Sequence, residues 1–177
     1  LHLSIRRQRQ MCIRDSSVEV PTARVLLDEF PNVFIMRTFS KAYGLANYRV
    51  GYMMSSAELA NYIQTIRLPY NLNTLSQVAA EAAFGDREFL RSTVEKNAAE
   101  RALWEQMLDE VGGTYYKSGA NFIFMSVPNA EVLADAWLAK GYQVRRGQRD
   151  NWLRVTLPTA SDGAIMRSIL KDYMARQ

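Results

Sequence analysis

One short stretch, RTFSKAYGLANYRVGY at residues 37–52, places a single lysine among small and hydroxyl residues. Lys41 follows the apolar run 33–36, and Arg49 comes eight positions later. A lysine amine attacks a carbonyl only when it is unprotonated, and apolar surroundings or a nearby cation lower its pKa from about 10.4. We interpret the apolar run as a buried strand, which makes Lys41 a candidate nucleophile at its end.

Groups that suit an anion surround this lysine. Thr38 and Ser40 carry hydroxyl donors, and Gly44 lets another group approach the backbone closely. Arg49 can hold a phosphate or a carboxylate through two parallel hydrogen bonds. Together these residues suit an anionic carbonyl cofactor, although as isolated residue types they also fit an ordinary solvated loop.

Strand-like and helix-like segments alternate from Val18 onward, and this alternation predicts an α/β fold. The expected strands are 33–36, 49–54, 121–127, 142–145 and 152–157. The expected helices are 22–30, a segment between Ser56 and Pro69, 74–84, a long segment from about 86 to 111, 129–140, and a last helix from Ser161 onward.

Helix ends and helix faces follow from residue types and spacing. Ser55 or Ser56, Thr74 and Ser161 are the expected N-caps. The long helix carries apolar residues at helical spacing, and so does the last helix. Those residues are Leu90, Val94, Ala98, Leu103, Met107 and Val111 in the first case, and Ile165, Ile169 and Tyr173 in the second.

The first segment, 1–17, differs in character from the rest of the chain. It holds four arginines and one aspartate, so it carries +3 of the formal net charge of +4. The remaining 160 residues are nearly neutral, which argues against a nucleic-acid-binding protein despite a pI near 9.3. No stretch is apolar enough for a signal peptide or a membrane span, so we expect no membrane association.

Within that segment, RRQRQMCIRDS resembles translated sequencing-adapter read-through, and we interpret 1–17 as foreign to the fold. A natural basic arm or an arginine-rich transit peptide is the rival interpretation. His2 and Cys12, the only histidine and cysteine, both lie here. We therefore expect no intrachain disulfide, no metal site and a cytoplasmic protein.

The order T-x-S-K-A-Y-G-L-A-x-x-R-x-G resembles the pyridoxal-phosphate lysine segment of fold-type I aminotransferases, and it is most similar to that of the histidinol-phosphate aminotransferases. The resemblance continues through PYNLNTLSQVAAEAA, GANFIF, QVRRG and WLRVTLPT, over about 18–177. It implies the C-terminal part of the large cofactor-binding domain at 18–85, a connecting helix at 86–112 and the α/β small domain at 113–177.

The resemblance also implies roles for single residues. Lys41 would bind pyridoxal 5'-phosphate covalently and later move a proton between the substrate's α-carbon and the cofactor. Ser40 and Arg49 would hold the cofactor phosphate, with Thr38 a weaker candidate. Arg154, assisted by Arg145, would grip the anionic end of the substrate at strand ends. That group is the carboxylate of glutamate or the phosphate of histidinol phosphate, and a 2-oxo acid would be the amino acceptor.

Several parts of the family pattern are missing. The aspartate that pairs with the pyridine nitrogen, the stacking aromatic and the glycine-rich phosphate turn belong to an upstream half, and Asp28 lies too close to Lys41 to replace that aspartate. We therefore expect an incomplete fold that is inactive by itself and forms a homodimer when full length.

Other functions stay open at this point. An aromatic amino-acid aminotransferase or a threonine-phosphate decarboxylase of the same fold could carry much the same segments. Pro158, where the family commonly has glycine, and a short loop between Arg145 and Arg154 leave the substrate undetermined. A more distant hypothesis is a nucleic-acid-binding module in which Phe122 and Phe124 form a stacking platform, and the last is a non-catalytic interaction fragment.

Overall fold

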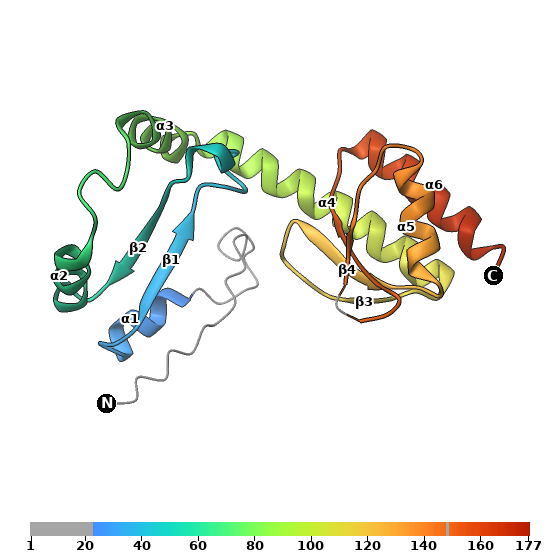
Figure 1. Cartoon of the computed structure of the whole chain (residues 1–177), viewed down its shortest axis with the longest axis horizontal. Helices are drawn as coiled ribbons and strands as arrows, with labels where there is room; N and C mark the ends of the chain where they lie inside the picture. The colour runs from blue at the N-terminus through green and yellow to red at the C-terminus, as the bar shows by residue number, and fades with distance from the viewer. Residues whose placement is uncertain (1–22, 148) are drawn as a thin grey trace. The chain divides into compact units, whose positions relative to one another are not determined.

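The computed structural model describes residues 23–147 and 149–177, which fall into two compact units divided between Ser92 and Thr93. Predictions for 1–22, including the foreign segment, therefore lie outside the described residues. The elements are η1 (Ala23–Val25), α1 (Leu26–Glu29), β1 (Phe34–Thr38), η2 (Ala46–Tyr48), β2 (Gly51–Ser55), α2 (Ala57–Ile66), α3 (Thr74–Gly85), α4 (Arg87–Val111), β3 (Thr114–Tyr116), β4 (Phe122–Ser126), α5 (Ala130–Leu138), β5 (Arg145–Arg146), β6 (Trp152–Thr156) and α6 (Ala160–Met174) (Figure 1). None of the described helices is long and apolar enough to cross a bilayer.

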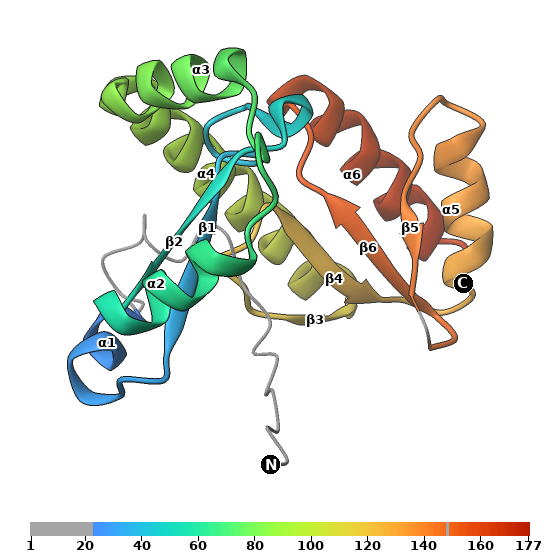
Figure 2. The ribbon, with the colours of Figure 1, turned by 60° about the vertical axis from the view of Figure 1, so that its left-hand side comes forward.

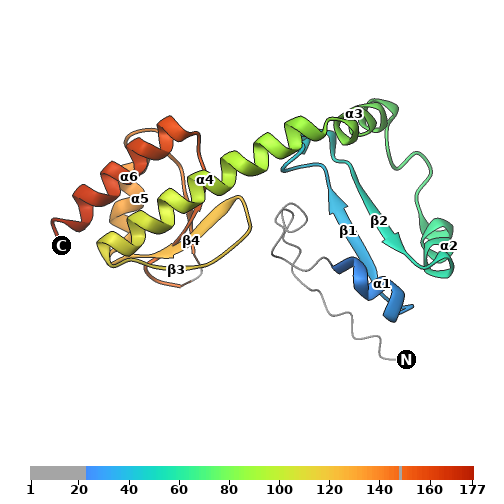
Figure 3. The ribbon, with the colours of Figure 1, turned by 180° about the vertical axis from the view of Figure 1, so that it is seen from behind.

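The first unit is built on two antiparallel strands, β1 and β2, which lie side by side (Figures 1 and 3). Thr38, at the end of β1, is opposite Gly51, at the start of β2. A Cβ at Gly51 would lie 2.5 Å from the carbonyl oxygen of Arg37, so a larger residue would push the strands apart. This close pairing fixes both ends of the loop 39–50.

The strand before the lysine is not the buried strand that the sequence predicts. Ile35 is buried, but Phe34 and Met36 on the opposite face of β1 are exposed. The apolar face of α2 is likewise open, with Tyr62 and Ile66 largely exposed. Among the described residues, therefore, only one face of this part of the chain is covered, and the prediction of a buried strand is wrong there.

The second unit is a four-stranded antiparallel sheet in the order β3-β4-β6-β5, with the helices α5, α6 and part of α4 packed against it (Figure 2). Alternate residues of β4 and β6 face these helices and are fully buried, as a strand period of two requires. The core consists of Trp104, Leu108, Ile123, Met125, Val127, Ala130, Leu133, Ala134, Trp137, Leu153, Val155, Met166 and Leu170.

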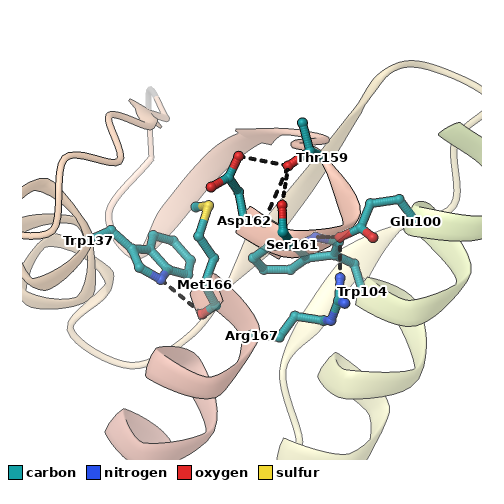
Figure 4. Close-up of polar contacts among 8 residues, drawn as sticks. All are labelled: Glu100, Trp104, Trp137, Thr159, Ser161, Asp162, Met166 and Arg167. Atoms are coloured by element: carbon teal, nitrogen blue, oxygen red, sulfur yellow. Dashed lines mark hydrogen bonds and ion pairs between the residues drawn. The ribbon is translucent and has the colours of Figure 1, made fainter. Parts of the chain in front are cut away.

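A charged pair lies inside this core. Glu100 of α4 and Arg167 of α6 form an ion pair, and Nε1 of Trp104 donates a hydrogen bond to the same carboxylate oxygen at 3.0 Å (Figure 4). Both charged side chains are buried. A buried charge is costly without a partner, so each of these two side chains depends on the other.

Several element boundaries differ from the predicted ones. Asn73 caps α3 in place of Thr74, and Thr159 caps α6 in place of Ser161, whereas the cap of α2 is Ser56 as expected. The strand expected at 142–145 is only Arg145–Arg146, and β3 has no counterpart among the predicted strands.

Helix faces also differ. The long helix buries Glu100, Trp104 and Leu108. Of the predicted stripe, Leu103 is exposed, whereas Met107 packs against the core as expected. On α6, Ile165 is exposed, while Ile169 and Tyr173 pack against the core as expected.

Candidate active site

Lys41 lies in a turn that backbone hydrogen bonds hold at several points. The N–H of Gly44 donates to the carbonyl of Lys41 at 2.9 Å, and the N–H of Leu45 donates to the carbonyl of Phe39 at 3.0 Å. Gly44 has a φ of 72°, a conformation that favours glycine. Phe39 is buried in the small core of the first unit, so the turn is anchored directly beside the lysine.

Among the described residues, the amine of Lys41 forms no hydrogen bond and no ion pair. Its side chain is exposed. The apolar walls that the sequence predicts around this amine are therefore not supplied by the described residues of the first unit, because β1 buries only one of its faces.

Two hydroxyl groups lie just before the lysine. The hydroxyl of Thr38 donates to Oγ of Ser40 at 2.9 Å, and the backbone N–H of Ser40 donates to Oγ1 of Thr38 at 3.1 Å. Thr38 uses its only hydroxyl proton in this contact, whereas Ser40 keeps its own proton for another acceptor. The Ser40 hydroxyl can therefore still donate to a further acceptor, while Thr38 contacts it from two positions before.

The sequence predicts that Arg49 is the first residue of a strand, but in the structure it is the residue that ends η2. It has φ 53° and ψ 40°, an uncommon left-handed conformation for a side chain of this size. Nη1 donates to the carbonyl of Ala46 at 2.9 Å. Among the described residues its other N–H groups have no partner, and these can bind an anion.

A buried serine supports the backbone just before Arg49. Oγ of Ser76 on α3 donates to the carbonyl of Tyr48 at 2.7 Å, and Ser76 itself is almost fully buried. Nothing in the sequence pattern singles out Ser76, because the contact joins residues 28 positions apart. Its role depends on how α3 packs against η2.

In the second unit, Arg145 and Arg154 are direct partners in the register of β5 and β6. Arg154 lies in the middle of β6, not at a strand end as predicted. The two arginines line an open, shallow pocket of about 500 Å³, together with Gln143, Val144, Arg146 and Thr156. Gln143 and Thr156 are polar lining residues that lie within the quoted motifs QVRRG and WLRVTLPT, although the motifs predict no role for either of them.

The residues around Lys41 fit a phosphorylated carbonyl compound, judged by their chemistry. They offer an unpaired amine, a hydroxyl proton on Ser40 and unpaired guanidinium N–H groups on Arg49. The pocket beside Arg145 and Arg154 fits a second anion. No group of histidine, cysteine, aspartate and glutamate residues among the described positions could hold a metal ion.

A family model described as "Aminotransferase class I and II" matches residues 10–169. A histidinol-phosphate aminotransferase from Lactiplantibacillus plantarum is 51% identical over 154 residues, which are 87% of this chain and 43% of that protein. This chain therefore spans less than half the length of that relative.

Solved structures agree on the fold. A histidinol-phosphate aminotransferase from Sinorhizobium meliloti, in complex with pyridoxal-5'-phosphate, matches with a TM-score of 0.72 at 25% identity, over 82% of this chain and 42% of that one. A histidinol-phosphate aminotransferase from Clostridium acetobutylicum matches with a TM-score of 0.83 at 20% identity, over 96% of this chain and 53% of that one. The α/β fold is that of part of a fold-type I aminotransferase, as the sequence predicts.

Proposed function

This chain belongs to the aminotransferase class I and II family, and we propose that it supplies the cofactor lysine and the substrate-binding arginines of a histidinol-phosphate aminotransferase. The reaction is the transfer of an amino group between histidinol phosphate and 2-oxoglutarate, with pyridoxal 5'-phosphate as cofactor. The observation that carries the proposal is the unpaired amine of Lys41 in one short loop with Ser40 and Arg49. The 51% identity to a protein of that name supports the choice of substrate.

Each residue of the loop has a separate task in this proposal. Lys41 would hold the cofactor through its amine and would carry the proton that leaves the substrate's α-carbon. Ser40, oriented by Thr38, donates its hydroxyl proton to the phosphate, and Arg49 donates from its guanidinium. Pyridoxal 5'-phosphate, when bound there, would supply an acceptor for the electron pair that the departing α-proton leaves behind.

Arg154 and Arg145 bind the anionic end of the substrate. That end is the carboxylate of glutamate in one half-reaction and the phosphate of histidinol phosphate in the other. Guanidinium groups suit both anions because their planar N–H donors match two oxygens at once. The support for this assignment is the pocket that both arginines line.

The first experiment tests Lys41 on the chain itself. Pyridoxal phosphate is added below one equivalent, the adduct is reduced with borohydride, and peptide mass spectrometry locates the label. We expect most of the label on Lys41 and a clear decrease in Arg49→Gln. Pyridoxal, which lacks the phosphate, should not show this preference.

Lys140 provides the matched control, since it is also an exposed lysine but lies after α5. Lys140→Ala should leave the labelling of Lys41 unchanged, whereas Lys41→Ala should remove the dominant labelled peptide. Equal labelling of Lys41 and Lys140 in the unaltered chain would contradict the assignment.

The second experiment tests the substrate. Residues 18–177 replace the matching part of the Lactiplantibacillus plantarum relative, and transamination by this chimera is measured with 2-oxoglutarate. We expect activity with histidinol phosphate and none after Lys41→Ala. A preference for phenylalanine or tyrosine, or release of carbon dioxide from threonine phosphate, would replace the proposed substrate with one of the alternative reactions.

The proposal includes a homodimer and a cytoplasmic enzyme. Large apolar side chains remain exposed in the first unit, and surfaces of this kind in proteins are usually covered by further protein. They include Tyr62, Ile66, Leu68, Tyr70, Leu75 and Val78. Analytical ultracentrifugation of the chimera should give the mass of two chains, and a monomer at micromolar concentration would contradict this part.

A further inference from the structure

The two neighbouring arginines of β5 differ in their ion-pair partners. Arg146 forms ion pairs with Glu131 at 2.5 Å and with Asp135 at 2.7 Å. Arg145, one position earlier, has no ion pair among the described residues, and the same holds for Arg154 opposite it. Like charges directly opposite on neighbouring strands repel each other. Two unpaired arginines in this position therefore indicate a place for an outside anion.

The guanidinium of Arg154 lies over an aromatic ring. Its guanidinium carbon lies 5.1 Å from the ring centroid of Phe122 on β4. In the register, Phe124 is the direct partner of Arg154 and Phe122 is the partner of Thr156, so Phe122 is a diagonal neighbour on the same sheet face. Diagonal neighbours are within reach of aromatic and long side chains.

Two further observations limit what Phe122 can do. The Nε atom of Arg154 is buried and has no hydrogen-bond partner among the described residues, so no hydrogen bond at that atom orients the side chain. Phe122 does not line the pocket that Arg145 and Arg154 form. Any effect of Phe122 on an anion in this pocket must therefore pass through Arg154.

We propose that Phe122 is a positioning residue whose ring holds the guanidinium of Arg154 for anion binding in the pocket shared with Arg145. This rests on the anion-binding role of Arg154 in the proposed function. The attraction between a cation and an aromatic face restricts the guanidinium without using the N–H groups that must bind the anion. The ring thus orients the guanidinium of Arg154, which no acidic side chain among the described residues does.

The experiment follows Arg154 by NMR in the chain itself, with inorganic phosphate as the probe. Ring current from Phe122 should shift the side-chain protons of Arg154 upfield. Phe122→Leu should remove this shift and weaken phosphate binding about three- to tenfold. Phe122→Tyr, which keeps the aromatic face, should retain the shift and bind within about twofold of the unaltered chain.

Tyr116→Leu is the matched control, since Tyr116 is an aromatic residue on the same sheet face that stacks on Phe124 and Trp152. It should change neither the Arg154 signals nor phosphate binding. If Arg154→Gln abolishes binding while Phe122→Leu leaves it unchanged, the positioning role is wrong and the proposed function stands.

Arg154→Gln separates the two claims. If it leaves phosphate binding unchanged, the arginine assignment fails, and the role of Phe122 fails with it. Should Phe122→Leu not fold, the unaltered chain still decides: an upfield shift of the Arg154 protons supports the proposal, and unshifted protons overturn it.

Discussion

Gly163 on α6 leaves the space that the carboxylate of Glu100 on α4 occupies. A Cβ at position 163 would lie 2.6 Å from Cδ of Glu100 and 2.9 Å from Nη1 of Arg167. Glu100 and Arg167 are both buried, and Trp104 donates to the same carboxylate. The missing side chain at Gly163 therefore permits a charged network inside the core of the second unit.

Replacing Gly163 with alanine should destabilise the second unit by about 2–3 kcal/mol, because the new methyl group displaces the Glu100 carboxylate. Helix propensity alone would stabilise the same variant by up to about 1 kcal/mol, so the two effects have opposite signs. Urea unfolding followed by tryptophan fluorescence measures the difference. Gly119→Ala, where a Cβ would meet nothing within 4 Å, is the control, and equal effects of the two substitutions would contradict the crowding argument.

Glu100→Gln and Arg167→Met should each lower the free energy of unfolding by about 3–5 kcal/mol, since each leaves the other group buried without its charged partner. The double variant should lose clearly less than the two single variants together. A double-mutant cycle in urea measures this coupling, which we expect to exceed about 1 kcal/mol. Additive losses would show that the two side chains act independently.

Ser76→Ala should loosen the segment before Arg49. It removes the hydrogen bond to the carbonyl of Tyr48, which is partly buried, a loss of about 0.5–1.5 kcal/mol. Hydrogen–deuterium exchange should become faster in residues 46–50, and phosphate-dependent labelling of Lys41 should decrease. Thr65→Ala removes an exposed hydroxyl that bonds within α2, and it should change neither measurement.

The stability of the second unit should fall at alkaline pH. Partial burial and the hydrogen bond to Asp162 raise the pKa of Tyr142 above its usual value of 10.0. The folded state therefore keeps the phenol proton where the unfolded chain loses it, so this contribution to stability is present below pH 10.0 and is lost as the pH rises above it. Unfolding in urea between about pH 8 and about pH 11 should show a smaller fall for Tyr142→Phe.

Tyr115 should behave in the same way, because partial burial and its hydrogen bond to Asp109 raise the pKa of this phenol. Tyr116→Phe is the control, since the described residues give its hydroxyl no hydrogen bond. If Tyr142→Phe and Tyr116→Phe have identical pH profiles, the hydrogen bond to Asp162 does not govern the alkaline fall.

Local chemistry predicted much of the fold. The N-cap of α2 at Ser56 is confirmed, and so is the α/β alternation. The buried face of α4 was predicted wrongly because Leu103 looks like core, while Glu100 looks like surface. The charge of Glu100 is paired in the core by Arg167, 67 positions away, and no helical period reveals such a contact.

The candidate site could likewise be predicted from the sequence only in part. The order of residues around Lys41 indicated the lysine, both hydroxyl groups and Arg49, and these assignments stay predictions. The left-handed backbone of Arg49 was not predicted, because Val50 and the residues after it look like one continuous strand. Phe122 was missed as a neighbour of Arg154 because their contact depends on the register of β4 against β6.

The pairing of β5 with β6 decides which arginine is available to a ligand. Successive side chains of a strand point to opposite faces, so Arg145 shares a sheet face with Arg154, whereas Arg146, which also lines the pocket, is paired with the acidic residues of α5. One residue inserted or deleted in the short connection between these strands would exchange the two. The length of that connection thus sets which of the two consecutive arginines stands opposite Arg154 without an acidic partner among the described residues.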